Sequence, residues 1–155
     1  MSANRHLAPH ALLANFQVFA VRDSSKSKNV YFKLTSSISP NPLPELTSSN
    51  FFGVYNDQDW NLSVSVVPNK SGSFKFVSGS DSYDYTLMFE GYNTILGDVR
   101  DSFSVQQTIS KEKGENFLKN SKRVYAGAYR QNLTGSLVSK SDVLISGVRY
   151  WLKTI

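Results

Sequence analysis

The feature that most constrains the fold is a regular alternation of apolar and polar residues in short runs. The clearest run is Trp60-Asn-Leu-Ser-Val-Ser-Val66, in which every second residue is apolar. Successive side chains of a β-strand point to opposite faces of its sheet, so this run predicts a strand with one buried and one polar face. Such strands are typical of antiparallel sheets that cover a core on one side only.

Further β-type runs follow along the chain and are separated by turn-forming residues. They are residues 16–22, 29–35, 73–77, 83–89, 103–109, 123–130 and 142–152. The first two flank a turn that begins Asp23-Ser-Ser, so they predict a hairpin. Prolines at positions 40, 42 and 44 predict an ordered or extended loop over residues 36–50, because proline lacks the N–H that a strand ladder needs.

Only one segment, 110–119, has the character of a helix. Ser110 is the predicted cap, Phe117 and Leu118 are the predicted docking side chains, and Gly114 weakens the helix. The chain lacks the longer helical patterns that parallel strands need for their crossovers. The sequence therefore predicts an all-β fold, a two-sheet antiparallel β-sandwich of the jelly-roll type with one short helix.

The length of 155 residues fits one domain that buries its own core. We expect residues 15–155 to form the sandwich and residues 1–14 to form a loose leader. Trp60 and Trp151 each continue an apolar alternation and are predicted to lie in the core. No apolar run approaches the roughly 20 residues of a membrane-spanning helix.

Several kinds of chemistry are excluded by composition. The chain has no cysteine, and its two histidines, His6 and His10, both lie in the predicted leader. Thiolate metal sites, cysteine nucleophiles and a Ser-His-Asp triad are therefore not expected. Residues 111–155 hold nine of the 17 Lys and Arg residues and three of the 12 Asp and Glu residues. These cations are spread over several predicted elements without a nucleic-acid-binding motif, so no nucleic-acid partner is expected.

The segments Arg123-Val-Tyr-Ala-Gly-Ala-Tyr-Arg-Gln-Asn-Leu-Thr-Gly135 and Ser141-Asp-Val-Leu-Ile-Ser-Gly-Val-Arg-Tyr-Trp151 carry a family resemblance, and 60–68 and 83–93 support it. Together they resemble a laminin-G-like, concanavalin A-like lectin/glucanase domain of the kind found in bacteriophage or virus structural proteins. The resemblance covers about residues 15–153 and implies a jelly roll at a virion or extracellular surface. Family members have further strand sequence before the segment like 16–22, so this chain is expected to be part of a larger protein or to receive a partner strand.

The related glucanases hydrolyse with paired carboxylates in a Glu-x-Asp-x-x-Glu pattern, which is absent here. Asp81 and Asp84 are three residues apart and are expected on opposite faces of a strand. We therefore expect a non-catalytic structural or adhesion domain of a virion or similar surface assembly. Its expected partners are other virion or surface proteins, including further copies of the chain. The alternative function is that of a lectin-like carbohydrate-binding module.

Glycan binding requires a flat aromatic ring beside amide or acid groups. The candidates are Tyr92 with Asn93, and Tyr125 or Tyr129 with Asn132; core packing of these rings is the alternative interpretation.

The segment Asn56-Asp-Gln-Asp59 brings oxygen ligands close together at Asn56, Asp57 and Asp59, and calcium prefers such ligands. The glycine and the bidentate glutamate of an EF-hand loop are missing, so a polar strand entry is the alternative interpretation. No other cofactor is expected.

Overall fold

The computed structural model describes residues 16–36, 42–69, 83–119, 125–130, 137–140 and 144–151. Within these ranges the elements in chain order are β1 (Gln17–Arg22), β2 (Asn29–Thr35), β3 (Leu46–Thr47), β4 (Phe51–Phe52), β5 (Trp60–Pro68), β6 (Tyr85–Ile95), β7 (Asp98–Ile109), α1 (Lys111–Lys119), β8 (Ala128–Arg130) and β9 (Leu137–Lys140). The predicted leader and the predicted strand 73–77 lie outside the described residues.

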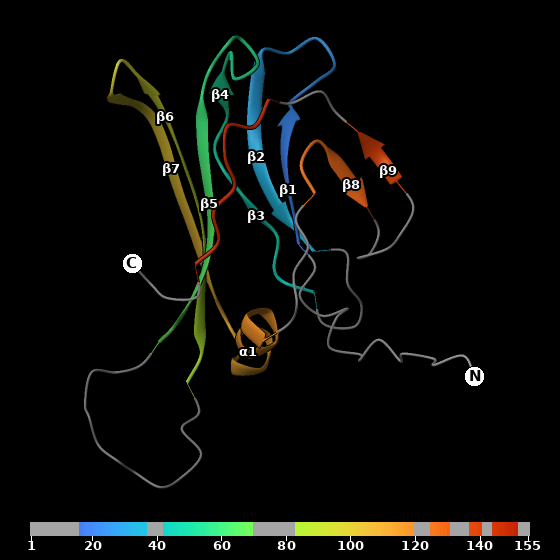
Figure 1. Cartoon of the computed structure of the whole chain (residues 1–155), viewed down its shortest axis with the longest axis vertical. Helices are drawn as coiled ribbons and strands as arrows, with labels where there is room; N and C mark the ends of the chain where they lie inside the picture. Colours follow the sequence, from blue (N-terminus) through green and yellow to red (C-terminus); the bar gives the residue numbers. More distant parts are fainter. Residues whose placement is uncertain are drawn as a thin grey trace, which may run out of the picture.

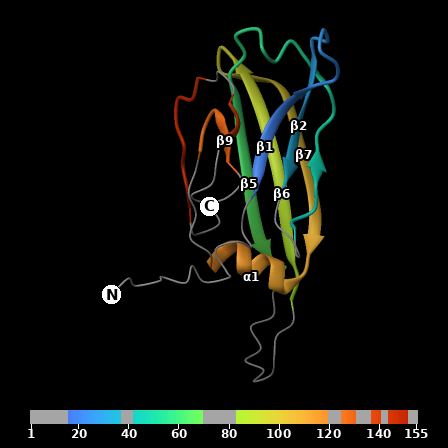
Figure 2. The same ribbon diagram turned by 90° about the vertical axis from the view of Figure 1, so that its right-hand side faces the viewer.

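The strands form two main sheets that face each other, as Figures 1 and 2 show. Sheet A has the order β1-β2-β3, with β4 also pairing with β2, and sheet B has the order β5-β6-β7. A separate ribbon is formed by β8 and β9. Every strand pair in the described part of the chain is antiparallel. The predicted all-β, two-sheet antiparallel sandwich with one short helix is thus confirmed.

The predicted first hairpin is confirmed, with Gln17 opposite Thr35 and Arg22 opposite Val30. The prediction of a strand-free loop over 36–50 is wrong at its end, because β3 pairs Leu46 with Leu34. This short strand begins two residues after Pro44, where backbone N–H groups are again available for a ladder. β6 and β7 extend beyond the predicted runs and meet at a two-residue turn, Leu96-Gly97.

The core lies between the sheets, with Val30, Phe32 and Leu34 from sheet A facing Leu87 and Phe89 from sheet B. Its centre is an aromatic cluster to which both sheets contribute. The Trp60 ring lies 4.7 Å from the Phe32 ring and 4.8 Å from the Phe51 ring, and Phe103 stacks on Phe32 at 5.4 Å. Trp60 thus packs against the core as predicted.

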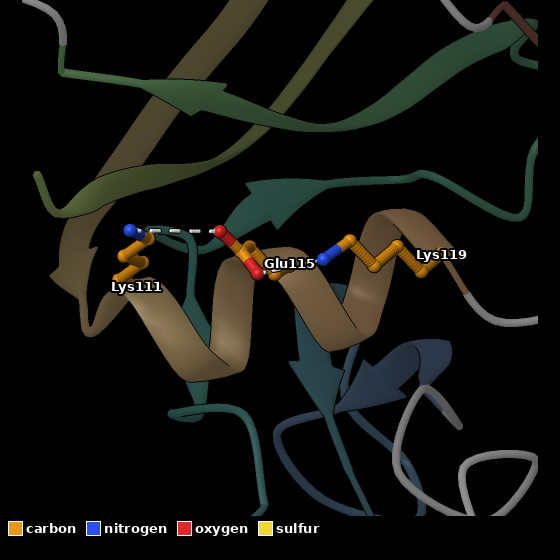
Figure 3. A network of polar contacts seen from close by, with 3 residues as sticks. All are labelled: Lys111, Glu115 and Lys119. Atoms are coloured by element: carbon orange, nitrogen blue, oxygen red, sulfur yellow. Dashed lines mark hydrogen bonds and ion pairs between the residues drawn. The ribbon is translucent and has the colours of Figure 1, made fainter. Parts of the chain in front are cut away.

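Helix α1 closes one end of the sandwich (Figure 1). The Ser110 hydroxyl accepts a hydrogen bond from the Lys113 N–H at 3.4 Å, so the predicted N-cap is confirmed. Along the exposed side, the Glu115 carboxylate lies 3.9 Å from the Lys111 ammonium and 2.7 Å from the Lys119 ammonium (Figure 3). The hydrogen bond from Lys119 lowers the pKa of Glu115 below its usual value.

The packing of α1 against sheet B explains why position 114 of the helix is a glycine. Phe117 is buried and its ring lies 5.5 Å from the Phe16 ring, whereas Leu118 is 40% exposed and does not dock as predicted. A Cβ atom at Gly114 would lie 2.3 Å from the Tyr85 ring. The helix can therefore approach the sheet this closely only because residue 114 has no side chain.

The C-terminal part of the chain departs from the prediction. Residues 144–151 do not form a strand, although 142–152 was predicted as one. Trp151 is 56% exposed, so its predicted place in the core is wrong. The alternating residues of this segment pair with no strand among the described residues, so the alternation does not give the segment a sheet face directed toward the core. No helix in the described part of the chain is long and apolar enough to span a membrane.

Candidate functional site

Sheet B has one apolar face toward the core and one polar face directed away from sheet A, here called the outer face. The pairing registers place each outward-facing residue beside outward-facing residues of the neighbouring strands. The outer face consists of Asn61, Ser63, Ser65, Val67, Thr86, Met88, Glu90, Tyr92, Ser102, Ser104, Gln106 and Thr108. Glu90 is the one charged residue among these twelve, and hydroxyl and amide groups make up most of the rest.

The two halves of the predicted Tyr92–Asn93 site lie on opposite faces of β6. Tyr92 lies on the outer face between Asn61 of β5 and Ser102 of β7 and is 46% exposed. Asn93 points into the sandwich and is fully buried. Successive residues of a strand always diverge in this way, so Asn93 does not accompany Tyr92 in a surface site. The amide that lies beside Tyr92 is that of Asn61.

Asn93 belongs instead to a buried polar network. Its side-chain N–H group donates to Gln58 Oε1 at 3.3 Å and to Asp101 Oδ2 at 3.4 Å. The Trp60 indole N–H donates to the same Gln58 oxygen at 3.1 Å. These bonds connect the loop before β5 to β6 and, through Asn93, to β7, and they orient the Trp60 ring in the core. Their geometry gives Asn93 a structural role.

A shallow hollow lies beside Tyr92. It has a volume of about 430 Å³ and is lined by Ser63, Glu90, Gly91, Tyr92, Ser102, Phe103 and Ser104. Its size falls within the range of roughly 300–1,000 Å³ for small-molecule sites. The Ser104 hydroxyl donates to the Glu90 carboxylate at 3.0 Å, which holds that acceptor in place. An amphipathic ring beside fixed hydroxyl and carboxylate groups is the arrangement that a sugar ring requires.

Glycoside hydrolysis at Glu90 would require a second carboxylate among its neighbours on the outer face. Ser63 lies opposite it on β5 and Ser104 opposite it on β7. The same-face neighbours along β6 are Met88 and Tyr92. None of these four positions supplies the second carboxylate that glycoside hydrolysis requires within roughly 5–10 Å.

The second predicted glycan site is only partly described by the structure. Tyr125 lies just before β8 and is 40% exposed. Tyr129 lies within β8 opposite Ser139, and Asn132 lies outside the described residues. The predicted grouping of these three residues therefore stays a prediction.

The predicted calcium ligands lie in the turn between β4 and β5. The side chains of Asn56, Asp57 and Asp59 are exposed, and Asp57 has a positive φ of 53°. The Asn56 N–H donates to the Gly53 carbonyl at 2.7 Å, which closes the turn. No group of three or more Asp, Glu, His or Cys side chains arranged to hold a metal ion occurs among the described residues. Calcium binding here stays a prediction.

Two exposed apolar segments were not predicted. Five of the eight residues 144–151 are large, exposed hydrophobic residues: Leu144, Ile145, Val148, Tyr150 and Trp151. The tip of the β6–β7 hairpin, at the upper left of Figure 1, exposes Ile95, Leu96 and Val99. The alternation of 142–152 does signal an apolar face, but a single sequence does not show whether that face is covered.

Comparison with protein-family models, with curated proteins and with solved structures finds no match to this chain. The fold and the site define a two-sheet antiparallel β-sandwich with an open polar face. The laminin-G-like resemblance stays an expectation that rests on the sequence motifs.

Proposed function

We propose that this chain is a non-catalytic domain that works by surface contact, as a structural or adhesion domain of a virion or similar surface assembly. The observation that carries the proposal is the apolar segment 144–151, in which Leu144 is fully exposed and Trp151 is 56% exposed. Large contiguous apolar surfaces on soluble domains mark sites of protein association. The virion setting is supported by the family resemblance of the sequence motifs.

The test is the mass of the protein in solution, measured by sedimentation over a range of concentrations, alone and with neighbouring proteins of the same assembly. We expect association, and we expect Ile145→Ser to weaken it. Leu137→Ser is the matched control, because Leu137 is 49% exposed and Ile145 is 46% exposed, but Leu137 lies in β9. A strict monomer that binds none of those neighbours contradicts the proposal. Equal weakening by both substitutions rules out segment 144–151 as the contact.

The hollow at Tyr92 favours a second candidate function, that of a carbohydrate-binding module. A glycan array tests it, with Tyr92→Ala as the variant and Phe52→Ala as the control. Both residues are exposed aromatics, at 46% and 68%, but Phe52 lies in β4 of the other sheet. We expect Tyr92→Ala to abolish glycan binding and Phe52→Ala to preserve it. Binding that survives Tyr92→Ala places the site elsewhere, and loss in Tyr125→Ala or Tyr129→Ala then identifies the second predicted site.

A further inference from the structure

β7 is an edge strand of sheet B. Among the described residues it pairs with β6 on one side and with no strand on the other. The opposite edge of the sheet, β5, has β8, β9 and residues 144–151 on its side of the molecule, whereas β7 lies away from them (Figure 2). An edge strand presents unpaired backbone N–H and C=O groups, which another strand can pair with.

Part of the β7 edge lacks the sequence features that commonly prevent such pairing, although β3 of sheet A packs close to this strand. From Ser102 to Ile109 it contains no charged residue, no proline and no glycine. The irregularity in its pairing with β6 lies nearer the hairpin tip, at Asn93/Thr94. Natural edge strands are commonly protected by lysine, by proline or by bulges, so an uncharged, regular edge of eight residues indicates a surface that is covered when the protein works.

One self-pairing register matches residue types across two copies of β7. With a two-fold axis at Ser104, antiparallel pairing places Phe103 opposite Val105 on the core side. On the outer face, Ser102 is opposite Gln106 and Ser104 is opposite itself. Asp101 is opposite Gln107, so like charges do not meet. A two-fold axis at Val105 instead places Asp101 opposite Ile109, and one at Phe103 places Asp101 opposite Val105.

We propose that β7 pairs antiparallel with β7 of a second copy of this chain, about a two-fold axis at Ser104, to form one continuous six-stranded sheet. Two copies then use the same surface, as in most homodimers. This inference rests on the proposed association function and names one of its contacts. The paired outer faces also bring two Tyr92 hollows onto one continuous surface.

The absence of cysteine from the chain allows a direct test by disulfide trapping. Residues directly opposite in an antiparallel pair have Cα atoms about 4.5–5.5 Å apart, within the range that a disulfide spans. We expect Ser104→Cys to form a covalent dimer under mild oxidation. We expect a mixture of the Ser102→Cys and Gln106→Cys proteins to form a covalent heterodimer. Ser63→Cys is the matched control, because Ser63 flanks Glu90 on β5 as Ser104 does on β7.

A second measurement uses charge. Ser104→Lys places two ammonium groups opposite each other at the axis, so we expect the dimer dissociation constant from sedimentation to rise about tenfold or more. Ser63→Lys adds the same charge on the other edge and is expected to change it less than twofold. Cross-linking at Ser104 no greater than at Ser63, or equal effects of the two lysines, overturns the β7 contact. If Ile145→Ser still weakens association in that case, the proposed function stands; a monomeric protein without partners removes both.

Discussion

Replacing Gly114 by alanine tests whether α1 lies directly on the ring of Tyr85. Alanine is a better helix former than glycine by about 1 kcal/mol, so this change would stabilise a helix whose residue 114 were exposed to solvent. Here the added Cβ atom would lie 2.3 Å from both Cγ and Cδ2 of Tyr85, well inside the roughly 3.5–4.0 Å separation of carbon atoms in contact.

The Tyr85 side chain has little room to yield, because it is 4% exposed and packed in the core. The added Cβ also approaches the Tyr85 Cβ atom to 2.8 Å, so turning the ring does not remove the clash and the helix must shift. Overpacking of this kind costs about 1–3 kcal/mol. After the gain in helix propensity is subtracted, we expect Gly114→Ala to lower the free energy of unfolding by up to about 2 kcal/mol.

The measurement is equilibrium unfolding in urea, followed by tryptophan fluorescence and by circular dichroism. Asn116→Ala is the matched control, since it also replaces a poor helix former in α1 but at a half-buried position. We expect it to be neutral or to stabilise the protein by up to about 0.7 kcal/mol. If Gly114→Ala stabilises the protein as much as Asn116→Ala does, the close approach of α1 to Tyr85 is refuted.

Three further predictions concern the core, the helix cap and pH. Phe32→Ala removes the centre of the aromatic cluster and is expected to cost about 3–5 kcal/mol in urea unfolding, whereas Phe52→Ala, at an exposed ring, is expected to cost less than about 0.5 kcal/mol. Ser110→Ala removes the cap of α1 and is expected to cost about 1 kcal/mol in thermal unfolding; an unchanged melting temperature contradicts the cap. Burial, followed by the hydrogen bond with Tyr83, raises the pKa of Tyr85 to about 12, from 10 in the unfolded chain. The unfolded chain therefore releases the Tyr85 hydroxyl proton at a lower pH than the folded protein does. The stability that the protonated Tyr85 hydroxyl contributes is complete below pH 10 and is lost as the pH rises toward 12. Tyr85→Phe should remove that part of the pH dependence. If the free energy of unfolding of the variant falls above pH 10 in the same way as that of the unchanged protein, the raised pKa of Tyr85 is contradicted.

The two-sheet fold could be predicted from the sequence because alternation and turn residues act locally. Trp60–Val66 needed no partner to be recognised as a half-buried strand, and Asp23 marked the turn of the first hairpin. The helix cap at Ser110 was predictable for the same reason. Leu118 was assigned wrongly because two adjacent helical residues lie about 100° apart, so only one of them faces the sheet.

The candidate site could be predicted only in part, because it depends on which strands become neighbours. Tyr92 was identified from its side chain alone, but its actual neighbours, Asn61 and Ser102, come from strands whose pairing no local pattern reveals. Asn93 was predicted to accompany Tyr92 because it is adjacent in sequence. Adjacent residues of a strand point to opposite faces, so the Asn93 side chain points into the core. Trp151 was assigned to the core from alternation, which shows that a strand has an apolar face but not that another element covers it.

The turn at the tip of the β6–β7 hairpin has a consequence for its leucine. Leu96 and Gly97 have φ angles of 53° and 93°, the left-handed backbone that two-residue hairpin turns need and that asparagine and glycine adopt most easily. A leucine held there carries about 1–2 kcal/mol of backbone strain. Its side chain is fully exposed, so contacts within the described part of the chain do not offset that strain. The hairpin thus presents an apolar side chain at a position where asparagine would make a more stable monomer, as expected if this leucine is used in a contact outside the domain.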